Sequence, residues 1–141
     1  MISDLTVKIK ATPYKKLTEA EKVWLCAEVD GWSVIKSKRG YWMLIYGKDV
    51  LPTKIYCNTH NLLEAAESDI INDTDYTSDI RAIRRLERKL HSWTWKYWDF
   101  VGEEMGWFDD RIDPTIYFLA DESKLFNALA RTIHAMHQEP K

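Results

Sequence analysis

The sequence has few of the residues around which catalytic and metal sites are usually built. Only two of its 141 residues are cysteine, and they form no Cys-x-x-Cys pair. A disulfide framework or a structural zinc site normally needs more cysteine than this. Only five residues are glycine, and no P-loop, dinucleotide fingerprint or Gly-x-Ser-x-Gly motif occurs. These absences favour a binding protein without a cofactor over an enzyme.

Long apolar runs are missing as well. No run approaches the roughly 20 residues that a membrane-spanning helix needs. Residues 1–5 show no basic segment leading into an apolar one, as a secretory signal peptide would. We therefore expect a cytoplasmic protein that does not enter a membrane. The net charge of −2 argues against general nucleic-acid binding, although basic residues concentrate in 1–56 and acidic residues in 57–141.

The apolar content is high enough for a buried core. Hydrophobic residues make up 45% of the chain, and its length is common for one domain. The sequence predicts a single α+β domain over 1–141, with a mostly antiparallel sheet that helices cover in a layered sandwich. An N-terminal strand and linker are expected at 1–16, and the sandwich core at 17–137.

The first part of the chain begins with an alternating pattern. Residues 5–10 alternate apolar and polar side chains, which predicts a half-buried strand. A capping box follows, in which the Thr18 hydroxyl can accept from a backbone N–H while Glu21 reaches back. The box predicts a helix that runs to about Val29, and Gly31 can supply the left-handed residue that ends it.

Three strands and several helices are predicted after this helix. Residues 32–35 and 41–46 favour two strands around a basic tip at 36–40, and 53–57 favour a third. The other expected elements are a helix at 62–70 capped by Thr59 or Asn61, a loop at 72–79, a helix at 80–90, a helix at 93–105 ended by Gly106, a strand at 115–119 and a last helix that Asp121 caps.

Four arginines lie on one face of the helix predicted at 80–90, with Lys89 beside them. This arginine stripe consists of Arg81, Arg84, Arg85 and Arg88. Their spacing is that of neighbours on a helix surface. Guanidinium groups match carboxylate and phosphate in a bidentate geometry, so this face could bind a partner or an anion. The alternative is a solvated helix face, on which Asp79 and Glu87 pair with the arginines.

Tryptophan is unusually frequent, with seven in the chain. Residues 93–108 hold too many aromatic rings for one helix to bury on one face. Exposed rings would form a surface for a partner protein, for self-association into a homo-oligomer or for a stacking ligand, whereas buried rings would belong to the core. Both uses stay open for the candidate binding residues Trp93, Trp95, Trp98 and Trp107.

Candidate metal ligands are sparse. His134 and His137 lie at i, i+3 on the last predicted helix, and Cys57 lies three residues before His60. Neither pair supplies the four ligands of a structural zinc site. No metal site is predicted, and whether either pair binds a metal stays open.

Three stretches together resemble the phage ABA-sandwich family of small phage and prophage proteins. Residues 25–32, Leu-Cys-Ala-Glu-Val-Asp-Gly-Trp, are similar to its opening helix. Residues 75–90 are similar to its Tyr-Ser/Thr-x-Asp helix start, and 125–135 to its closing helix. The resemblance implies a layered fold and a phage origin, and it carries over no catalytic residue.

These observations lead to a functional expectation. The protein would be a phage- or prophage-encoded, non-enzymatic binding protein that engages a host factor and inhibits a host defence or metabolic system. The alternative is nucleotide or nucleic-acid binding through the arginine stripe and the neighbouring tryptophans.

Overall fold

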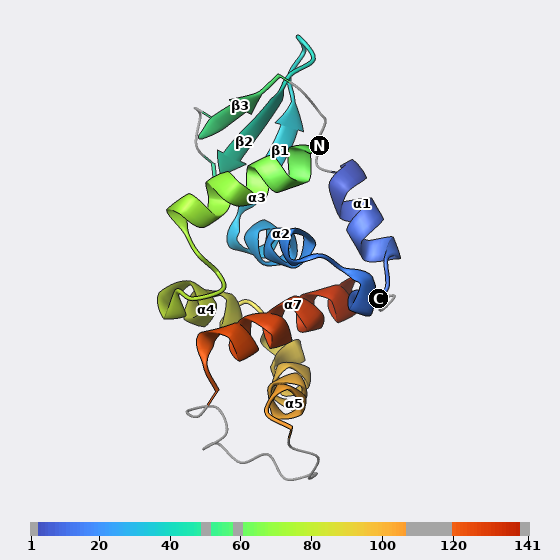
Figure 1. The fold of residues 1–141 in the computed structure, drawn as a ribbon, viewed down its shortest axis with the longest axis vertical. Helices are drawn as coiled ribbons and strands as arrows, with labels where there is room; N and C mark the ends of the chain where they lie inside the picture. The colour runs from blue at the N-terminus through green and yellow to red at the C-terminus, as the bar shows by residue number, and fades with distance from the viewer. Residues whose placement is uncertain (1–2, 49–51, 58–60, 107–119, 139–141) are drawn as a thin grey trace. The chain divides into compact units, whose positions relative to one another are not determined.

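The computed structural model describes residues 3–48, 52–57, 61–106 and 120–138 (Figure 1). Over these ranges the fold is α+β, with a three-stranded antiparallel sheet and a larger number of helices, so the predicted class is confirmed. The contacts divide the chain into two compact units, Met1–Thr74 and Asp75–Lys141. The single domain expected over 1–141 stays a prediction. The strand expected at 115–119 lies outside the described residues.

The start of the first unit corrects the predicted strand and linker at 1–16. Residues Ser3–Ala11 form helix α1, and Tyr14–Lys16 form the 3₁₀ turn η1. A strand would have placed Val7 and Ile9 on the same face, but Ile9 is buried and Val7 is 60% exposed. The buried pair is Thr6 and Ile9, at helical spacing, and the Thr6 hydroxyl donates to Glu28 of the next helix. Burial and this hydrogen bond outweigh a short alternating pattern.

Helix α2 spans Glu19–Asp30 and confirms the capping box. The Thr18 hydroxyl accepts from the Glu21 N–H at 3.2 Å, and the Glu21 carboxylate accepts from the Thr18 N–H at 2.9 Å. Gly31 ends the helix with a φ of 112°, which glycine adopts without steric cost. Four residues of the helix are fully buried: Val23, Trp24, Cys26 and Ala27.

Replacing Thr18 by alanine should lower the free energy of unfolding by about 1 kcal/mol, because one capping hydrogen bond is lost. Urea unfolding followed by circular dichroism measures this change. Thr53→Ala is the matched control, since Thr53 is exposed and precedes β3. Equal losses in the two variants would show that the capping box does not stabilise α2.

The sheet follows the predicted strands closely. Its strands are β1 (Trp32–Lys36), β2 (Trp42–Tyr46) and β3 (Lys54–Tyr56), in the order β1-β2-β3 with both pairs antiparallel. Val34 pairs with Leu44 in the register, and both are fully buried. Together with Trp32, they mark the face of the sheet that belongs to the core.

Helix α3 spans Leu62–Asp73 and lies next to α2, below the strands in Figure 1. Asn61 occupies the cap position but makes no side-chain capping bond. The Tyr56 hydroxyl donates to the Asp69 carboxylate at 2.5 Å and so joins β3 to α3. Burial raises the pKa of Tyr56, and the neighbouring Asp69 carboxylate raises it further. The Tyr56 hydroxyl therefore keeps its proton and can donate it to this hydrogen bond. Because α3 continues to Asp73, the loop expected at 72–79 is shorter than predicted.

The second unit is helical in its described part. Its elements are α4 (Ile80–Glu87), η2 (His91–Trp93), α5 (Thr94–Glu104) and α7 (Glu122–Gln138), and α7 packs against both α4 and α5 (Figure 1). Asp79 accepts from the Arg81 N–H and caps α4, and Asp121 accepts from the Lys124 N–H, each at 3.0 Å, so the cap predicted at Asp121 is confirmed. The helix predicted at 80–90 ends earlier, at Glu87. Across the described ranges, no helix combines the length and apolarity that crossing a membrane requires.

Candidate functional site

The arginine stripe lies on α4 and on the residue directly after it, Arg88, opposite a buried face. Ala82, Ile83 and Leu86 of this helix are fully buried. Arg81, Arg88 and Lys89 are exposed, whereas Arg84 and Arg85 are half-buried. The arginine face is the surface that carries Arg81, Arg84 and Arg85 of α4 together with Arg88, the residue at its C-terminal cap. Its two most outward side chains are those of Arg81 and Arg88.

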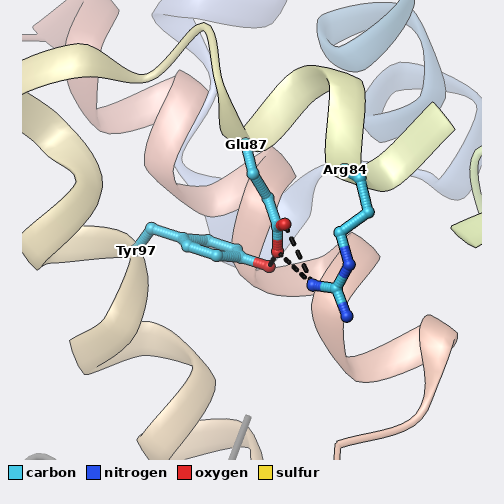
Figure 2. A network of polar contacts seen from close by, with 3 residues as sticks. All are labelled: Arg84, Glu87 and Tyr97. Atoms are coloured by element: carbon cyan, nitrogen blue, oxygen red, sulfur yellow. Dashed lines mark hydrogen bonds and ion pairs between the residues drawn. The ribbon is translucent and has the colours of Figure 1, made fainter. Parts of the chain in front are cut away.

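One arginine of this face belongs to a polar network (Figure 2). The Arg84 guanidinium donates to both carboxylate oxygens of Glu87, at 3.0 and 3.3 Å. The Tyr97 hydroxyl, which comes from α5, donates to the same carboxylate. The expected pairing of Glu87 with an arginine is confirmed for Arg84. The sequence reasoning missed Tyr97, because only the fold brings α5 against the end of α4.

The surroundings of Glu87 shift the pKa of its carboxyl in opposite directions. Burial raises the pKa of the Glu87 carboxyl, while the hydrogen bond from Tyr97 and the charge of Arg84 lower it, and burial prevails. The side chain of Glu87 is only 15% exposed. Its two donors act against the effect of burial on this carboxyl, and the contact with Glu87 ties Arg84 to the body of the unit.

The tryptophans of the predicted aromatic patch differ in exposure. Trp95 is 59% exposed, Trp93 and Trp98 are half-buried, and Trp107 lies outside the described residues. Trp95 precedes Tyr97 by two residues, which is a rotation of about 200° around a helix. Because Tyr97 points toward Glu87 of α4, Trp95 occupies the opposite side of α5. Lys96 lies over the Trp95 ring at 5.5 Å.

The candidate metal ligands do not assemble into a site among the described residues. Nowhere in this part of the chain do three or more His, Cys, Asp or Glu side chains gather as a metal site would require. His134 is buried on α7 and Cys57 is exposed, while His60 lies outside the described residues. Cys26 is buried, and burial raises the pKa of its thiol, which keeps it protonated and unreactive.

Comparison with known proteins assigns no relative. No protein-family model, curated protein or solved structure matches this chain. The resemblance to the phage ABA-sandwich family therefore stays a prediction.

Proposed function

We propose that the protein is a phage- or prophage-encoded binding protein that engages a host protein through the arginine face. It acts in the cytoplasm of the host cell and inhibits a defence or metabolic system there. The observation that carries the proposal is the exposure of Arg81 and Arg88, directly opposite the buried side of α4. A short helix with two outward guanidinium groups on a rigid support is suited to recognising carboxylates.

The partner's chemistry follows from the charges on α4. Glu87 is the one acidic residue within 80–89, and it is held by Arg84 and Tyr97. The positive charge of Arg81 and Arg88 therefore dominates the outer surface of the helix. An acidic patch on a host protein would complement it, and complementary charge speeds association and selects the partner. Arginine is also among the residues that contribute most to protein interfaces.

A pull-down from nuclease-treated host lysate tests the proposal. The baits are the tagged wild type, the variant Arg81→Glu/Arg88→Glu and the control Lys15→Glu/Lys16→Glu. The control makes the same change in charge at two exposed residues of η1. We expect one host protein to be retained by wild type and control. Its affinity for the α4 variant should fall on the order of 100-fold, because like charges would then face each other.

Two results would contradict the proposal. In one, the α4 variant and the control retain the same host protein equally well, so that the arginine face is not the contact. In the other, no host protein is enriched over an untagged lysate control. Circular dichroism of both variants establishes that they are folded, so that a lost interaction reports on the surface.

A second candidate function is supported by the spacing of the outward arginines. Arg81 and Arg88 are seven residues apart, which is about 10 Å along the helix axis. Such a pair can contact two phosphates of a nucleic acid or of a nucleotide. Binding of this kind weakens steeply with salt, because neutralised phosphates release counterions. Retention of a nucleotide, or of nuclease-sensitive material from untreated lysate, by wild type and control but not by the α4 variant would favour this function.

A further inference from the structure

The sheet of the first unit has a second face, opposite the core face on which Val34 and Leu44 lie. Side chains alternate between the two faces of a strand. In the register, Ser33 pairs with Ile45, Ile35 with Met43, and Met43 with Ile55. The outer face of the sheet is defined here by these five residues. Four of them are large and apolar, and none is charged.

Part of this outer face is exposed. Ile35 is 37% exposed and Ile55 is 50% exposed, and the paired residue between them, Met43, is half-buried. An antiparallel sheet with one face in the core normally carries polar side chains on the other. A row of isoleucine, methionine and isoleucine across three strands departs from that pattern. Contiguous exposed apolar side chains of this kind indicate an interaction surface.

Positive charge surrounds the outer face. Lys38 and Arg39 are exposed in the turn before β2, and Lys48 is exposed just after it. Within 32–57 the sequence has one acidic residue, Asp49, which lies outside the described residues. Cations therefore stand at both ends of β2, with an uncharged apolar row between them.

We propose that the outer face binds an acidic, amphipathic segment of a partner protein. The apolar side chains of the segment would cover Ile35, Met43 and Ile55. Its carboxylates would pair with Lys38 and Arg39 at one end and with Lys48 at the other. This surface is separate from the arginine face, so the protein would have two contact surfaces, one in each unit.

Charge decides between this occupant and a second copy of the chain. A symmetric dimer through the outer face would bring the same basic rim of both copies together, and like charges in an interface cost several kcal/mol. An acidic segment gains from the same cations. Contacts with the apolar row supply the binding energy of the segment. The surrounding cations orient the segment and speed its association.

Peptide display selection with the purified protein tests this inference. The library of random peptides is selected on wild type and counter-selected on Ile35→Asp/Ile55→Asp. We expect enriched peptides with acidic net charge and at least two large apolar residues. Fluorescence anisotropy with a labelled enriched peptide should then show a loss of affinity of about tenfold or more in the double variant.

The control is Val7→Asp/Ile80→Asp, which places the same charges at two other exposed apolar residues. Ile80 is 37% exposed, as Ile35 is, and Val7 is 60% exposed. The control should bind the peptide as the wild type does. A further variant, Lys38→Glu/Arg39→Glu, should also weaken binding and reduce its dependence on salt.

Several results would overturn the inference. Enrichment of neutral or basic peptides would contradict the charge argument, and no enrichment over the counter-selected variant would contradict the surface itself. Sedimentation of wild type as a dimer that Ile35→Asp/Ile55→Asp dissociates would identify a second copy as the occupant. Binding to vesicles of anionic phospholipid without peptide binding would identify a membrane surface instead.

Discussion

Replacing Trp24 by alanine is expected to lower the free energy of unfolding by about 3–5 kcal/mol, because a large buried side chain leaves a cavity. Trp24 is fully buried in α2. Its indole N–H also donates to the Thr6 hydroxyl at 3.4 Å, so the variant loses a contact between α2 and α1. A loss of this size is a large part of the stability of an ordinary domain, about 5–15 kcal/mol. Urea unfolding followed by circular dichroism measures it.

Trp95→Ala is the matched control, since it removes the same side chain from an exposed position of α5. Its effect should stay within about 0.5 kcal/mol, as for most surface substitutions. A loss below about 1 kcal/mol for Trp24→Ala, or similar losses for the two variants, would mean that the buried and exposed tryptophans are assigned wrongly. The same pair tests how the unusual tryptophan content divides between core and surface.

Replacing Tyr97 by phenylalanine is expected to cost about 1.5–3 kcal/mol where Glu87 is ionised, which is the range for a hydrogen bond to a charged group. The cost should be smaller where Glu87 is protonated. Tyr97 is one of two groups that lower the pKa of Glu87 against the effect of burial. Its removal should therefore raise that pKa further.

The pH dependence follows from the direction of this shift. The pKa of Glu87 is raised in the folded protein. The stability that Glu87 contributes is therefore complete below its unfolded pKa and is lost as pH rises through the folded pKa. In Tyr97→Phe the folded pKa is higher still, so the loss continues to higher pH. The difference in stability between wild type and Tyr97→Phe should grow across this window.

Urea unfolding at a series of pH values, from below to above the ordinary glutamate pKa, measures the difference. Glu87→Gln provides the control background, because glutamine keeps the shape of glutamate but does not titrate. Adding Tyr97→Phe to Glu87→Gln should change stability by the same amount at every pH in the series. If Tyr97→Phe still shows a pH-dependent loss in that background, Glu87 is not the titrating group.

Local sequence chemistry predicted the starts and ends of several elements correctly. Thr18 with Glu21, and Asp121, cap helices as expected, and Gly31 ends α2. A cap depends on one side chain and a few adjacent backbone N–H groups, so a short stretch of sequence is enough to identify it. The strands could be predicted for a similar reason, since turn residues and β-branched side chains mark them locally.

Features that depend on distant residues could not be predicted in this way. Residues 5–10 were expected to form a strand, but the contacts of Ile9 and Thr6 with later parts of the chain stabilise a helix. Tyr97 joins the network of Arg84 and Glu87 only because the fold brings α5 to the end of α4. The outer face of the sheet was missed because β1 and β2 carry large apolar or aromatic side chains on both faces. Alternation alone therefore did not distinguish buried positions from exposed ones.

The arginine face can be tested independently of the outer face of the sheet. It lies in the second unit, and the outer face of the sheet lies in the first. Charge reversal on α4 should leave peptide binding to the sheet unchanged, and Ile35→Asp/Ile55→Asp should leave the α4 contact unchanged. Failure of one proposal is therefore distinguishable from failure of the other.

Site-specific photocrosslinking in host cells tests the central claim most directly. The photoreactive residue p-benzoylphenylalanine replaces Arg88 in one strain and the exposed Lys16 in a control strain. We predict an adduct after irradiation at position 88 that nuclease leaves intact and protease degrades, and no such adduct at position 16. An adduct that nuclease removes, or equal protein adducts at the two positions, would contradict the claim that the arginine face binds a host protein.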